Sequence, residues 1–106
     1  MSEWNFSIQN QFGISPGAEI NSDALTQLLT HSIRQKLEQS FEELMQILYR
    51  FDVSEKKIDA VFNRLPQSHW PEAIALLIIE REKIRMTFRQ KYAEEDERKK
   101  GKKPDN

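Results

Sequence analysis

Side chains suited to catalysis or metal binding are few in this 106-residue chain. There is no cysteine, and the two histidines, His31 and His69, stand 38 positions apart without forming a His-x-x-x-His pair. Protein metal sites draw on His, Cys and carboxylate ligands at short, recurrent spacings. The glycine-rich phosphate loop and the nucleophile elbow of hydrolases are also missing. We therefore expect no catalytic residue, no cofactor-binding residue, no metal ligand and no small-molecule substrate, and we expect that the protein is not an enzyme.

Basic residues near the C-terminal end suggest a second chemistry, the binding of phosphate groups. Arginine recurs at every fourth position from 81 to 89, and a lysine-rich segment follows. Lys and Arg along one helix edge, together with a basic tail, neutralise the phosphates of RNA or DNA. Against this, residues 94–97 are all acidic and the isoelectric point is near 6.1. Nucleic-acid binding is the alternative hypothesis, with candidate contacts at Arg85, Arg89, Lys99, Lys100, Lys102 and Lys103.

Residues 73–79 form a run of seven consecutive apolar residues. A helix at the protein surface is apolar along one stripe only, so this run must be covered on more than one side. In a helix over residues 71–93, most of this apolar character falls on one broad face that should pack in the core, comprising Ile74, Leu77, Ile78, Ile84, Phe88 and Tyr92. A second, narrower stripe comprises Ala75, Ile79 and Met86. Two stripes predict two packing partners: the long first helix, and either the middle helix, the N-terminal arm or another subunit.

The N-terminal residues 1–21 show a different pattern. Trp4, Phe6 and Ile8 alternate with polar residues, which is typical of an extended segment with one apolar face. Two alternatives stay open: a disordered or loosely docked arm, or an arm that docks on another subunit with Trp4 and Phe6 as anchors.

The remaining pattern predicts an all-α fold with three helices in an antiparallel arrangement. A long helix over residues 23–51, capped by Asn21 or Ser22, is followed by a short helix over residues 55–65 and by the third helix. The predicted organisation is an arm (1–21), a helical domain (22–93) and a charged, disordered tail (94–106).

Location is predicted from what the sequence omits. The longest apolar run is far below the roughly 20 residues that cross a bilayer, and the first residues lack the basic and apolar regions of a secretory signal. We expect a cytoplasmic protein that has no membrane partner.

Two short pieces, residues 48–55 (LYRFDVSE) and 77–82 (LIIERE), resemble a group of short uncharacterised bacterial proteins of the Bacteroidetes type. The resemblance extends over about residues 40–85. It implies a bacterial cytosolic origin and brings no activity, cofactor or site. The placement of the two pieces suggests that Arg81 pairs with Asp52 or Glu55 and fixes the register of the helical hairpin.

The leading hypothesis is a non-enzymatic protein–protein interaction module, either self-associating as a homodimer or serving as a small subunit of a larger cytoplasmic assembly. Excess apolar surface on the helices and the aromatic arm support it. The candidate partner-binding residues are Trp4, Phe6, Ile8, Ala75, Ile79 and Met86.

Overall fold

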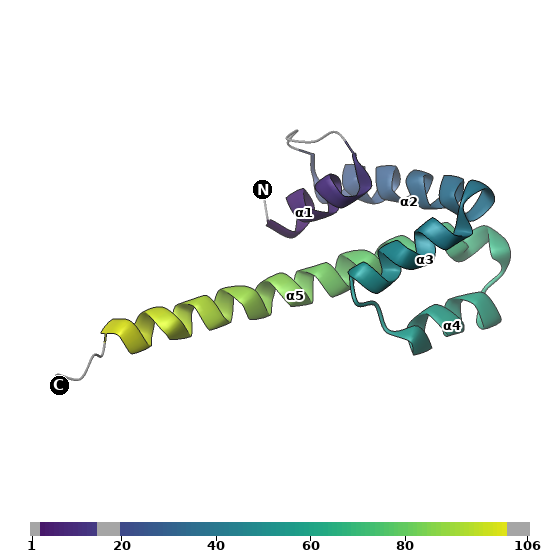
Figure 1. Cartoon of the computed structure of the whole chain (residues 1–106). Helices are drawn as coiled ribbons and strands as arrows, with labels where there is room; N and C mark the ends of the chain where they lie inside the picture. Colours follow the sequence, from purple (N-terminus) through teal and green to yellow (C-terminus); the bar gives the residue numbers. More distant parts are fainter. Residues whose placement is uncertain (1–2, 15–19, 102–106) are drawn as a thin grey trace.

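The computed structural model describes residues 3–14 and 20–101, and the side chains of 3–14, 20–89 and 91. Throughout this part of the chain the regular secondary structure is helical, which confirms the all-α class (Figure 1). The three predicted helices are replaced by five α-helices and one 3₁₀ turn. Their bounds are α1 Glu3–Phe12, α2 Ser22–Gln39, α3 Phe41–Arg50, α4 Glu55–Arg64, η1 Gln67–His69 and α5 Trp70–Gly101.

The first helix replaces the extended arm, so that expectation is wrong. The apolar positions fit a period of two, but Trp4, Ile8 and Phe12 also lie four apart, on one face of a helix. Gly13, with φ of 64°, ends α1 in a Schellman motif, in which the N–H of Ile14 donates to the carbonyl of Gln9 (2.9 Å). Residues 1–2 and 15–19 of the predicted arm lie outside the described residues.

The predicted long helix over 23–51 is also wrong, because it is broken at Ser40. This residue has φ −157° and ψ 73°, and α3 folds back from it beneath α2 (Figure 1). The break brings Lys36 in the last turn of α2 within 3.3 Å of Glu43 in the first turn of α3. Both charges complement the dipoles of their helix ends. The start of α2 is as predicted: the side chain of Asn21 accepts a hydrogen bond from the N–H of Ala24 (2.8 Å).

A second Schellman motif ends α3. The N–H of Asp52 donates to the carbonyl of Tyr49 (3.0 Å), and that of Val53 donates to the carbonyl of Leu48 (3.1 Å). Val53 and Leu48 are both buried, which supplies the hydrophobic contact common in this motif. Asp52 has φ of 59°, in the left-handed region that glycine usually occupies.

The core lies around the first half of α5, which contacts α1, α2, α4 and η1. α1 and α2 run along one side of α5 and antiparallel to it (Figure 1). The buried side chains of α5 recur at spacings of three and four, so one face of the helix points into the core. Much of the core comes from Leu25, Leu29 and Ile33 of α2, Leu44, Ile47 and Leu48 of α3, and Ile74, Ala75, Ile78 and Ile79 of α5.

α5 is longer than predicted. It continues to Gly101 instead of ending near Ala93, so the expected disordered tail is helical from 94 to 101, and residues 102–106 lie outside the described residues. At 1.5 Å per residue its 32 residues span about 48 Å. The C-terminal part projects past the other helices (Figure 1), which makes the molecule elongated, 60 × 32 × 21 Å.

Candidate protein-interaction surface

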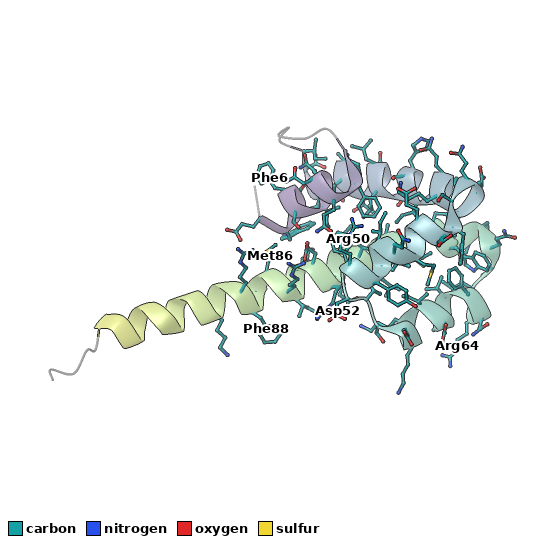
Figure 2. The ribbon with its side chains drawn as sticks, in the orientation of Figure 1. Phe6, Arg50, Asp52, Arg64, Met86 and Phe88 are labelled. Atoms are coloured by element: carbon teal, nitrogen blue, oxygen red, sulfur yellow. The ribbon has the colours of Figure 1, made fainter. Side chains whose placement is uncertain are left out.

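Four of the six predicted partner-binding residues lie inside the monomer, which corrects that assignment. Ile8 and Ala75 are fully buried, and Ile79 and Met86 retain 7% and 8% of their exposure. The N-terminal segment, one of the candidate partners of the second stripe, packs on α5 as the helix α1, and Met86 lies between the two helices (Figure 2). The stripe therefore offers no surface to another protein in this state.

Trp4 and Phe6 are half-buried in α1. The Nζ of Lys83 lies 4.7 Å from the centroid of the Trp4 ring, a cation–π contact that joins α1 to α5. Phe6 lies on the side of α1 that faces away from α5 (Figure 2). The two predicted anchors thus differ: Trp4 holds α1 on its own chain, and Phe6 is at the molecular surface.

Sequence reasoning missed a polar network between α1 and α5. Glu82 is fully buried at the centre of the core-facing side of α5. Its Oε2 accepts a hydrogen bond from the hydroxyl of Ser7 (2.5 Å), and its Oε1 lies 3.4 Å from Nη1 of Arg85. In α1, the amide of Gln9 donates to that of Asn5 (2.7 Å), and both are buried. These partners offset the cost of burying polar groups and hold α1 in register.

A groove of about 340 Å³ opens on the other side of α5, and we call it the outer groove. The Nη2 of Arg81 lies 3.0 Å from Oδ2 of Asp52, the pairing that the sequence suggested, whereas among the described residues Arg81 forms no ion pair with Glu55. A second ion pair joins Lys57 to Glu80 at 3.7 Å. The Nε of Arg81 is buried without an acceptor in the described part of the chain. The groove is lined by Asp52, Val53, Ser54, Lys57, Leu77, Glu80, Arg81 and Ile84.

Apolar side chains continue from this groove along α5. Leu77 is half-buried, Ile84 is 39% exposed and Phe88 is 52% exposed. Their spacings of seven and four place them along one side of the helix, and Phe88 points away from the bundle (Figure 2). We call Leu77, Ile84 and Phe88 the outer stripe. It belongs to the broad apolar face that the sequence assigned to the core, so that assignment is wrong for Ile84 and Phe88.

A second groove, of about 390 Å³, lies between the C-terminal half of α2, the start of α3, η1 and the start of α5. Phe41 is 48% exposed there. Its ring lies 5.8 Å from that of Phe62, which in turn packs edge-on against Trp70 at 4.9 Å. The indole N–H of Trp70 donates to the carbonyl of Leu65 (3.1 Å). These contacts connect α3, α4 and α5, so the aromatic side chains here serve the packing of the monomer.

The basic residues of the nucleic-acid alternative are dispersed. Arg85 is engaged with Glu82, and Arg89 is exposed one turn further along α5. Lys99 and Lys100 lie on the projecting part of the helix, and Lys102 and Lys103 are outside the described residues.

Among the described residues, no three His, Asp or Glu side chains come close enough together to hold a metal ion. Within the same part of the chain, every helix is too short or too polar to cross a lipid bilayer. Comparison with protein-family models, with curated proteins and with solved structures finds no match to this chain. The resemblance of residues 40–85 to short bacterial proteins stays a prediction.

Proposed function

We propose that the protein is a non-enzymatic protein–protein interaction module, and that its contact surface is the outer groove together with the outer stripe. The observation that carries the proposal is the exposure of Ile84 and Phe88 on a helix that projects beyond its own bundle. Apolar patches bordered by charged residues are characteristic of binding surfaces. A cytoplasmic location is part of the same proposal.

The groove adds polar specificity to this surface. The ion pairs Arg81–Asp52 and Lys57–Glu80 lie in its lining and are largely exposed, so they favour a partner with complementary charges. Val53, Leu77 and Ile84 provide the apolar lining beside these pairs. An apolar centre bordered by charged groups is a common design of protein interfaces.

Site-specific photo-crosslinking tests the proposal. A photoreactive phenylalanine analogue replaces Phe88 in the full chain, and the same analogue replaces Gln27, an exposed residue of α2, as the control. After irradiation in an extract of the source cell, we expect discrete protein adducts from position 88 and only background from position 27. Equal, background-level labelling at both positions would contradict the proposal, whatever the identity of the captured chain.

The nucleic-acid alternative draws less support, because Arg81 and Arg85 are engaged in ion pairs with Asp52 and Glu82. A gel-shift assay with single- and double-stranded probes at low and high salt distinguishes the two functions. Binding that weakens steeply with salt and is lost on Arg89→Glu would favour the alternative, since phosphate contacts depend strongly on ionic strength.

A further inference from the structure

Charge along α5 is arranged in blocks of alternating sign. Residues 72–80 carry a net charge of −2, residues 81–91 carry +4, residues 94–97 carry −4 and residues 98–100 carry +3. All four blocks lie on one continuous helix, and the outer stripe runs along the first two of them. Such a pattern distinguishes between ways of placing two copies of the helix side by side.

An antiparallel pair brings opposite blocks together. When the overlap is centred near residue 90, residues 94–97 of one copy face residues 83–86 in the basic span of the other. Residues 98–100 face residues 80–82, so that Lys100 is opposite Glu80 and Lys99 is opposite Arg81. A parallel pair in register would place every block against its own sign. Complementary charge favours the correct partner and orientation chiefly by penalising the wrong one.

The projecting half of α5 needs such a partner more than any other helix does. The last buried side chain described on α5 is Met86, and beyond it the helix leaves the bundle (Figure 1). A single helix of about 15 residues is only marginally stable in water, and most helical stability comes from packing. A second α5 lying along the outer stripe supplies that packing.

We infer that the partner of the outer stripe is a second copy of this chain, joined through an antiparallel α5–α5 contact with its twofold axis near residue 90. The face of α5 over residues 80–100 forms the contact on both subunits, as a twofold dimer requires, and the outer stripe of one copy lies against the projecting part of α5 of the other. The inference rests on the proposed function and deepens it by naming the partner. Phe88 lies within one turn of the axis and faces position 92 of the other copy, two residues before its acidic block.

Sedimentation equilibrium on the full chain tests the association. We expect a dimer, and we expect Phe88→Asp to raise its dissociation constant by about tenfold to a hundredfold, because a buried aromatic is replaced by a carboxylate. Phe88 is half exposed in the single chain, so circular dichroism should show the same helix content in the variant. Gln27→Asp is the matched control and should leave the dissociation constant unchanged.

A second variant removes the charge complementarity without touching the stripe. Reversing residues 94–97 (E94K/E95K/D96K/E97K) makes the helix basic from 81 onward, and we expect it to shift the equilibrium to monomer. The wild-type dimer should also weaken as salt rises, because exposed charge pairs are screened at about 1 M. A dimer that is indifferent to both changes would overturn the charge argument.

Orientation is tested with single-cysteine variants, since the chain has no cysteine of its own. In the antiparallel pair the two copies of position 84 lie about 18 Å apart along the helix axis, and the two copies of position 88 lie about 6 Å apart. A short bis-maleimide should therefore link Phe88→Cys and not Ile84→Cys, whereas a parallel pair would link both.

A monomer at every concentration would overturn the inference. If position 88 still crosslinked to a different protein in the cell extract, the proposed function would stand with another partner. If neither result appeared, both proposals would fail.

Discussion

Asp52 combines a backbone role with a side-chain role at one position. Its left-handed conformation ends α3, and its carboxylate holds Arg81 at 3.0 Å on the rim of the outer groove. A left-handed conformation disfavours residues with a Cβ, and asparagine and aspartate tolerate it better than alanine does. The ion pair is largely exposed, so it contributes at most about 1 kcal/mol. Three substitutions separate the two roles.

We expect Asp52→Ala to be the most destabilising of the three, by about 1–2 kcal/mol, because it loses the ion pair and keeps the backbone strain. Asp52→Asn loses only the charge and should cost less than about 1 kcal/mol. Asp52→Gly relieves the strain and should lie close to wild type. Urea unfolding measures the order, and an alanine variant as stable as the glycine variant would contradict this account of the turn.

Glu82 is a buried carboxylate at a position that helical spacing reserves for an apolar side chain. It is stable there because Ser7 and Arg85 supply hydrogen-bond donors. A buried acceptor that loses a donor costs more than a pair removed together. The arrangement therefore predicts strong coupling between Ser7 and Glu82.

Ser7→Ala should cost about 1.5–3 kcal/mol, since the carboxylate loses its shortest hydrogen bond. In a background that already carries Glu82→Met, the same change should cost less than about 0.5 kcal/mol, because no buried charge is left behind. A double-mutant cycle by thermal or urea unfolding measures the difference. Equal costs in the two backgrounds would show that the pair does not act as a unit.

Among the elements, those with clear local signals were predicted well. The start of α2, the short helix α4 and the start of α5 follow caps, prolines and apolar spacing that act within a few residues. α1 was predicted as an extended segment because its apolar positions fit two periods at once, although Gly13 is a common helix C-terminal signal. The break at Ser40 was missed although residues 40–43 read Ser-x-x-Glu, a capping-box sequence.

The contact surface was less predictable, because it depends on how the other helices pack against α5. Periodicity shows which side of α5 is apolar, but the bundle rotates the helix so that the buried face lies between the two predicted stripes and includes Glu82. Which stripe stays exposed depends on where α1 docks, and α1 is held partly by polar contacts that no apolar pattern marks.

The residues at the N-terminal ends of α2 and α3 should contribute differently to stability. The side chain of Asn21 accepts a hydrogen bond from α2, whereas the side chain of Ser40 makes no such bond to α3. Asn21→Ala should therefore cost about 1 kcal/mol and Ser40→Ala less than about 0.5 kcal/mol. Urea unfolding of the two variants under one condition checks this. A larger loss at Ser40 would mean that the capping box forms in solution and defines the break.

At the scale of the whole molecule, we expect the helices to differ in their free energy of local opening, with α1 opening most easily. α2 and α5 share an apolar interface, whereas α1 buries Asn5 and Gln9 beside Ile8 and reaches α5 through the Ser7–Glu82 hydrogen bond. A helix with few buried apolar groups opens locally before the global transition. The opening of α1 would expose the part of α5 around Glu82 and Met86, which α1 covers when closed.

Ile8→Ala tests whether α1 opens as a unit of its own. The truncation removes a fully buried side chain, an effect of about 2–4 kcal/mol when the surroundings stay folded. If α1 opens locally, native-state hydrogen exchange should accelerate by about tenfold or more in the amides of α1 and much less in the buried half of α2 around Leu29. Equal acceleration in both helices would mean that α1 unfolds only with the whole bundle, so that the part of α5 around Glu82 and Met86 is never exposed without global unfolding.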